Sequence, residues 1–214
     1  MFMIKSSLRL GALLALTAAA SLSAATAVRY EAQPGGSKMK IDGTSTIHDW
    51  TVECGVIGGF MEFDATFPSA SPTAAPDAVK PRVEISVPVR QLKSGKKSMD
   101  TVMLDAMKQT KFPKIEYRIL DLKPTAGAKG STAQFDATGI LTIAGVTRTN
   151  TMPVSIERIE AAKMKVTGIT KLKMTDFGIK PPSPDVPGLS ALIKTGDEVK
   201  ITFEWTTAKA EAAK

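Results

Sequence analysis

The stretch AQFDATGILTIAGVTRTNTMPVSI, residues 133–156, decides the fold class of this chain. In its first half, apolar or small residues occupy every second position, and mostly polar residues stand between them. Ala144 and Gly145 then supply a turn, and the alternation resumes behind it. A period of two residues places successive side chains on opposite faces of a strand. The stretch therefore predicts a β-hairpin with one apolar wall and one polar wall.

The N-terminus has the pattern of a secretory signal peptide. Two basic residues precede an apolar run over 10–20, and small residues that signal peptidase accepts end at Ala27. The run is shorter than the roughly 20 residues that span a bilayer, which disfavours a membrane anchor. We expect 1–27 to be a signal peptide and 28–214 to be a single exported domain.

The charge of the chain argues against nucleic acid as a partner. The predicted signal peptide holds two of the 28 Lys and Arg residues and none of the 21 Asp and Glu residues, so the net charge of +7 falls by two on cleavage. The lysines are dispersed along the predicted strands and no aromatic residues interleave with them. A transient contact with an anionic membrane surface and a homodimer both stay open.

The residues that usually carry catalysis or bind metal are scarce. Cys54 is the single cysteine and His48 the single histidine, so we expect no disulfide, no metal and no cofactor. We expect Cys54 to be a buried, unreactive thiol and His48 to bond a nearby strand or Asp49. No nucleophile elbow or phosphate loop is present, and carboxylates such as Asp136 and Glu204 fall on polar faces. An enzyme is disfavoured, although a catalytic pair assembled from distant loops stays open.

The period of two recurs along the rest of the chain, always with one polar face. This pattern is typical of antiparallel sheets, since parallel strands covered by helices are apolar on both faces. About eight such strands must close into a barrel or split into a sandwich, and the period leaves both open. The residues predicted to point inward are Met39, Ile41, Trp50, Val52, Cys54, Val56, Met61, Phe63, Ala65, Phe67, Val83, Ile85, Val87, Val89, Ile115, Tyr117, Ile119, Met164, Val166, Leu172, Met174, Val199, Ile201, Phe203 and Trp205.

One segment, between Lys96 and Thr110, has helical spacing instead. Ser98 is the predicted N-cap, and Pro113 follows the predicted end of the helix. A short amphipathic helix here could plug one end of the sheet, or could form a methionine-lined lid that adapts to an apolar ligand. Its apolar face comprises Met99, Val102, Met103, Ala106 and Met107.

Five short segments carry a resemblance to a known family. They are STIHDW (45–50), SGKK (94–97), FPKIEY (112–117), GILTIAGVT (139–147) and DFGI (176–179). In this order they resemble the YceI-like family of bacterial periplasmic proteins, over about 37–207. The resemblance implies a periplasmic, antiparallel, lipocalin-like β-barrel whose lumen holds a long polyisoprenoid chain.

Two features differ from the commoner pattern of that family. The methionine-rich run at 99–107 replaces a basic, histidine-bearing turn, and 180–198 is a Pro-rich insertion. The resemblance therefore does not extend to recognition of a lipid head group. Recognition of the tail remains implied, because burial of apolar surface needs only an apolar lumen.

Whether the lumen is hollow is a separate question. An eight-stranded barrel is just wide enough to be filled by its own side chains or to hold one ligand. The small inward residues Ala133, Ala137, Gly139 and Gly168 favour a cavity.

We therefore expect a carrier or store of an isoprenoid quinone or polyprenyl lipid that performs no chemistry. The alternative is a protein-interaction or stress-response module that uses the sheet surface or 180–198. The residues expected to contact the ligand are Trp50, Val52, Ile85, Val87, Met103, Met107, Phe112, Phe135, Leu141, Ile143, Met152, Val154, Ile156, Phe177 and Leu189.

Overall fold

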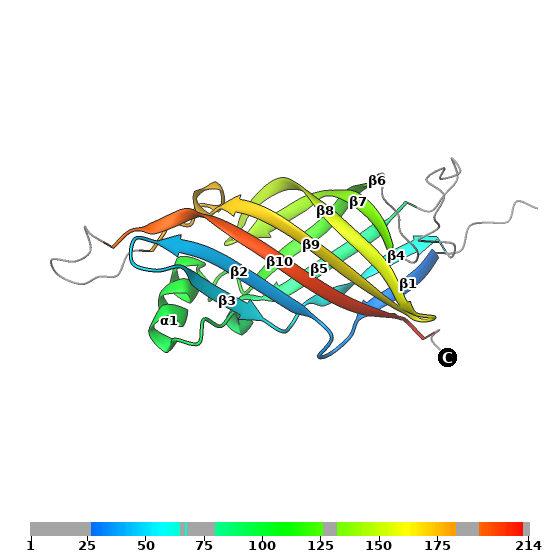
Figure 1. The fold of residues 1–214 in the computed structure, drawn as a ribbon, viewed down its shortest axis with the longest axis horizontal. Helices are drawn as coiled ribbons and strands as arrows, with labels where there is room; N and C mark the ends of the chain where they lie inside the picture. The colour runs from blue at the N-terminus through cyan, green and yellow to red at the C-terminus, as the bar shows by residue number, and fades with distance from the viewer. Residues whose placement is uncertain (1–26, 65–66, 68–79, 126–131, 183–192, 212–214) are drawn as a thin grey trace, which may run out of the picture.

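The computed structural model describes residues 27–64, 67, 80–125, 132–182 and 193–211. Most of these residues form antiparallel strands, and the one α-helix among them is α1 (Lys97–Ala106) (Figure 1). Two 3-10 turns, η1 (Val89–Gln91) and η2 (Met174–Phe177), follow strands. The strands are β1 (Ala27–Ala32), β2 (Lys38–Ser45), β3 (Trp50–Cys54), β4 (Gly58–Asp64), β5 (Arg82–Pro88), β6 (Lys114–Pro124), β7 (Thr132–Ile143), β8 (Val146–Glu160), β9 (Lys163–Lys173) and β10 (Thr195–Lys209).

The strands close into an antiparallel barrel of eight. β1 pairs with β4 on one side and with β10 on the other, which closes the order β1-β4-β5-β6-β7-β8-β9-β10 into a ring. β10 pairs with β1 near its C-terminal end and with β2 over the rest of its length toward α1. β3 pairs with β2, and Glu53 of β3 forms an isolated β-bridge with Lys93. Figure 1 shows α1, β2 and β3 at one end of the barrel and β1 at the other. The predicted all-β barrel with one short helix is confirmed.

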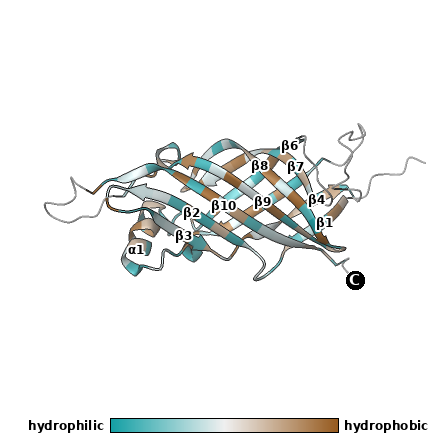
Figure 2. Ribbon diagram, viewed as in Figure 1, coloured by the Kyte–Doolittle hydropathy of each residue, from teal (hydrophilic) through white to brown (hydrophobic). Residues whose placement is uncertain are grey.

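The central hairpin has the predicted register. Ala133 pairs with Ile156 and Ile143 pairs with Val146, and the inward residues of β7 are buried. Figure 2 shows the resulting alternation of apolar and polar residues along the strands. Cys54 also points inward as predicted: it is 2% exposed, and burial raises the pKa of its thiol.

The end of the barrel away from α1 is packed with aromatic side chains. The rings of Phe63 and Phe67 stack with centroids 3.9 Å apart, and Phe135 stacks on Phe67 at 5.4 Å. Arg158 closes this end, where Nη2 donates to the Phe67 carbonyl at 2.7 Å and Nη1 donates to the Tyr30 hydroxyl at 3.3 Å. Side chains with at most 1% exposure fill the same half: Met61, Met164 and Trp205.

Three details differ from the predictions. Strand β1 was not predicted, although residues 27–32 also alternate. Val56 was predicted to point inward and is 45% exposed, whereas Ile57 is 5% exposed. The reason is that β3 ends at Cys54, and the three residues before β4 break the period of two.

The third difference is the helix start, because Ser98 lies inside α1 and does not cap it. The N-cap position is Lys96, whose side chain makes no capping bond. The turn before α1 is held instead by Asp100, whose Oδ1 accepts hydrogen bonds from the Ser94 amide at 2.7 Å and the Ser94 hydroxyl at 2.6 Å. The bond from the hydroxyl and then that from the amide lower the pKa of Asp100.

Gly139 and Gly168 do not leave the lumen hollow, so the prediction of a cavity beside these two residues was wrong. A Cβ atom on Gly139 would lie 2.3 Å from the ring of Tyr117, and one on Gly168 would lie 2.5 Å from the ring of Phe203. Aromatic side chains from neighbouring strands therefore occupy the space that these glycines leave.

Tyr117 gives a test of this packed region. Its hydroxyl is buried and makes no hydrogen bond within the described residues, and burial raises the pKa of Tyr117 to about 12 from its ordinary value of 10.0. Above pH 10 the unfolded chain loses this proton while the folded protein keeps it, so stability falls as pH rises. From pH 8 to pH 11, urea unfolding should show wild type losing roughly 1 kcal/mol more than Tyr117→Phe. Parallel losses in the two proteins would contradict the burial of this hydroxyl.

Candidate functional site

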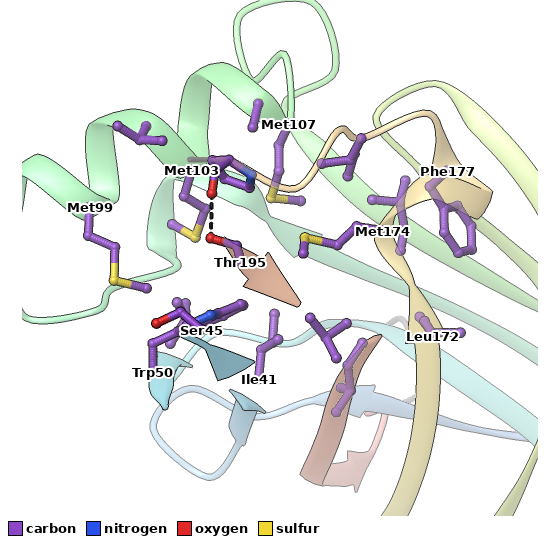
Figure 3. Close-up of a pocket in the computed structure, with 18 of the residues that line it drawn as sticks. Ile41, Ser45, Trp50, Met99, Met103, Met107, Leu172, Met174, Phe177 and Thr195 are labelled. Carbon is purple, nitrogen blue, oxygen red and sulfur yellow. Dashed lines mark hydrogen bonds between the residues drawn. The ribbon is translucent and has the colours of Figure 1, made fainter. Parts of the chain in front are cut away.

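A cavity of about 440 Å³ lies inside the barrel at the α1 end. Most of its wall is apolar, and the methionines of α1 face the strands across it (Figure 3). This volume is within the range of small-molecule sites. The apolar lining residues are Ile41, Ile47, Trp50, Val52, Met99, Val102, Met103, Ala106, Met107, Ile115, Ile143, Leu172, Met174, Phe177, Ile179, Pro182, Ile193, Val199 and Ile201.

The cavity lies where two strands separate. β8 and β9 pair from the Glu160 end only as far as Val154 and Gly168, so the first residues of β8 and the last residues of β9 have no ladder between them. The chain after β9 enters this gap, where Phe177 and Ile179 are buried and line the cavity. The barrel is therefore wider at the α1 end than at the aromatic end.

The separation also leaves a polar cleft beside the cavity. The cleft is about 520 Å³ and shares Leu172, Lys173 and Phe177 with the cavity wall. Within it, Lys171 pairs with Glu198 at 3.0 Å, and the other charged residues of its wall are Arg148, Lys173 and Asp176. The apolar cavity is the better candidate for a lipid site.

Helix α1 covers the mouth of the cavity. None of its residues is buried, although Met107, which follows it directly, is 9% exposed. Met99 and Met103 project from α1 toward Trp50 and Ile41 (Figure 3). Met99, Met103, Leu104 and Ala106 of α1 are half-buried and pack against the core, so the helix closes this end of the barrel and also presents methionines to the cavity.

Polar groups stand among the lining residues and gather around the mouth. The Ser45 hydroxyl donates to the carbonyl of His48 at 2.7 Å, and the Thr195 hydroxyl donates to the carbonyl of Pro182. The ring Nδ1 of His48 lies 3.1 Å from the Asp49 carbonyl, so His48 is hydrogen-bonded locally, as predicted. The complete polar lining within the described residues is Ser45, His48, Lys96, Ser98, Lys173 and Thr195.

The structure brings together only part of the predicted ligand-contacting set. Those that line the cavity are Trp50, Val52, Met103, Met107, Ile143 and Phe177. Those that lie elsewhere are Ile85, Val87, Phe112, Phe135, Leu141, Met152, Val154 and Ile156, of which all but Ile85 and Phe112 are buried in the core. Leu189 lies outside the described residues.

Phe112 has a different position from the one expected. Its ring covers the β7–β8 turn, where a Cβ atom on Gly145 would lie 2.3 Å from it. Ile41, Leu172 and Ile201 also line the cavity. They were predicted to point inward but were not among the residues predicted to contact the ligand.

The profile of the YceI-like domain matches residues 26–207 of the sequence. The chain belongs to the YceI-like family. The matched range includes every lining residue of the cavity. A search of curated protein sequences gave no significant match.

Solved structures show the same fold. The protein BcnA from Burkholderia cenocepacia is 18% identical, with a TM-score of 0.61 over 82% of this chain and 98% of BcnA. A polyisoprenoid binding domain from Saccharophagus degradans, implicated in plant cell wall breakdown, is 12% identical, with a TM-score of 0.62 over 85% and 98% of the two chains. The YceI protein of Campylobacter jejuni is 16% identical, with a TM-score of 0.51 over 75% and 85%.

The contrast between the packed and hollow halves can be measured with two alanine variants. Leu141 is 8% exposed and lies in the packed core, so Leu141→Ala should lower the free energy of unfolding by about 2–4 kcal/mol. Met103 is half-buried and borders the cavity, so Met103→Ala removes less buried surface and should cost about 1 kcal/mol or less. Urea unfolding of both variants checks this, and equal losses would argue against the division of the lumen.

Proposed function

We propose that this protein carries or stores a long-chain isoprenoid lipid by burying the tail in the cavity under α1. The observation that carries the proposal is an almost wholly apolar cavity of about 440 Å³ with a methionine-lined cover. Membership in the YceI-like family and the fold shared with a polyisoprenoid binding domain support it. An isoprenoid quinone and a polyprenyl compound both have such a tail.

The cavity wall suits a flexible tail of this kind. Methionine has three rotatable bonds and a polarizable sulfur, so Met99, Met103 and Met174 can adapt to a branched chain without a fixed shape. Burial of apolar surface contributes roughly 25 cal/mol per Å², whatever the order of the groups along the tail. Affinity for the tail therefore needs no specific polar partner.

The proposal includes no chemical step. Within the described residues, the cavity wall holds one histidine and no carboxylate or cysteine. We propose that the protein binds the lipid by shielding its tail from water and releases the unchanged lipid elsewhere.

We propose a periplasmic location for this activity. The N-terminal segment has the pattern of a signal peptide, and family membership supports the same compartment. Residues 1–26 themselves lie outside the described residues. In the part of the chain that is described, the helix lacks the length and apolar character needed to cross a bilayer.

Lipid content tests the function with a matched pair of helix variants. Met103→Arg puts a charge on the cavity side of α1, and Thr101→Arg adds the same charge on its exposed side. A charge in an apolar site opposes tail binding. Protein purified from its native host, extracted with organic solvent and analysed by mass spectrometry should release about one isoprenoid per chain from wild type and Thr101→Arg, and much less from Met103→Arg.

Neither Thr101 nor Met103 is fully buried, so both variants should keep the wild-type circular dichroism spectrum. A folded Met103→Arg protein with a full lipid load would contradict the proposed cavity. Repeated lipid-free preparations of wild type would favour the protein-interaction alternative.

We also propose that the α1 end contacts anionic membranes when lipid is exchanged. Ile47 and Val102 border the cavity and are 62% and 45% exposed. The segment 93–111, which contains α1, carries five lysines and two aspartates. Each lysine near an anionic surface contributes about 1 kcal/mol to the free energy of membrane binding. The exposed apolar side chains contribute further by inserting into the membrane interface.

Vesicle sedimentation checks this membrane contact. Binding should require phosphatidylglycerol in phosphatidylcholine vesicles, and Ile47→Ser with Val102→Ser should weaken it about tenfold, the loss of roughly 1.4 kcal/mol. Leu120→Ser with Ile169→Ser is the control, because these residues are 54% and 47% exposed but do not border the cavity. Equal weakening by both pairs would contradict a specific membrane-facing end.

A further inference from the structure

The cavity ends part-way along the barrel. On three strands, the residue that lines the cavity is separated by two positions from a residue on the same face that does not border it. These pairs, with the lining residue first, are Ile115 and Tyr117 on β6, Ile143 and Leu141 on β7, and Ile201 and Phe203 on β10. The cavity therefore has a closed end inside the barrel.

Two aromatic rings lie at this closed end, Tyr117 of β6 and Phe203 of β10. The two strands are four places apart in the ring of eight, so the side chains project from opposite walls. Each ring covers a glycine of the neighbouring strand: a Cβ atom on Gly139 would lie 2.3 Å from Tyr117, and one on Gly168 would lie 2.5 Å from Phe203. We call Tyr117 and Phe203 the aromatic floor of the cavity.

The volume above the aromatic floor sets the length of tail that fits. The cavity measures about 440 Å³. A dry protein cavity of about 150 Å³ holds one benzene molecule, which has one carbon atom more than an isoprene unit, so this cavity holds about three such units. Beyond the floor, the stacked rings of Phe63, Phe67 and Phe135 fill the lumen. Further units of a longer tail would stay outside the barrel at the α1 end.

We infer that this protein shields about three isoprene units of its ligand, and that the aromatic floor sets this limit. The inference rests on the proposed function, because it concerns the tail in the same cavity. Each buried unit removes its apolar surface from water and adds to the affinity, whereas a unit outside the barrel adds nothing. Affinity should therefore rise with tail length up to three units and then stay constant.

The test uses three prenyl alcohols that differ only in tail length: geraniol, farnesol and geranylgeraniol, with two, three and four isoprene units. They are titrated into protein freed of lipid by refolding from guanidinium chloride. Fluorescence of Trp50 reports binding, because Trp50 lines the cavity while Trp205, the other tryptophan, is 1% exposed in the packed half. Wild type should bind farnesol about tenfold or more tighter than geraniol, and geranylgeraniol within about threefold of farnesol.

A variant of the aromatic floor should raise the limit. Phe203→Ala removes a ring about the size of one isoprene unit, so geranylgeraniol should bind about tenfold more tightly than farnesol. Phe60→Ala is the matched control, because Phe60 lies on the outer face of β4 with the guanidinium of Arg29 3.5 Å from its ring centroid. This control should keep the wild-type pattern.

A variant that fills the cavity should lower the limit. Ala106 of α1 lines the cavity, and Ala106→Phe adds a ring to the open space, so farnesol should bind within about threefold of geraniol. Thr101→Phe adds the same ring on the exposed side of α1 and should keep the wild-type preference for farnesol. If Phe203→Ala does not fold, this second pair decides.

The outcomes separate this inference from the proposed function. An affinity that rises as steeply from farnesol to geranylgeraniol as from geraniol to farnesol in wild type would overturn the length limit while still supporting an isoprenoid carrier. A folded Ala106→Phe protein with the wild-type preference for farnesol would also overturn it. If none of the three alcohols binds, the proposed function falls and the inference falls with it.

Discussion

The cavity depends on where the β8–β9 ladder stops. An eight-stranded barrel has an interior just wide enough for its own side chains, so a hollow needs a local departure from regular pairing. Here the ladder ends at Val154 and Gly168, and the two strands separate toward α1. On the side of that point away from α1, stacked aromatic rings fill the lumen. On the side toward α1, η2 and the methionines of α1 surround open space. One barrel thus provides a packed core for stability and a hollow for a ligand.

The fold could be predicted from the sequence because burial follows the period of two. The alternation in 133–156 fixed the hairpin register, and the absence of strands apolar on both faces indicated an antiparallel sheet. Closure into a barrel came from the family resemblance, since periodicity suits a sandwich equally well. The errors fell where the period is interrupted, as at Val56, where the chain leaves β3 and the alternation shifts by one residue.

The position of the cavity was harder to predict for a physical reason. Periodicity reports which face a residue occupies but not its depth along the barrel axis. Leu141 and Ile143 share one strand and one face, yet Ile143 borders the cavity and Leu141 packs in the core. Glycines mislead for a related reason: the space beside Gly139 and Gly168 belongs to rings on neighbouring strands. Only the three-dimensional register shows which large side chain fills the space left by a small one.

The same geometry places α1 where a ligand in the cavity would contact it. The methionines of α1 face the cavity, and no residue of the helix is fully buried, although Met99, Met103 and Leu104 are half-buried against the core. A tail in the cavity would contact Met99 and Met103 and remove their apolar surface from water, which stabilises the closed position of α1. Gly95 and Lys108 flank the helix with φ angles of 77° and 52°, and each marks a sharp turn where the chain changes direction. A tail in the cavity would therefore add to the core contacts that already hold this helix over the opening.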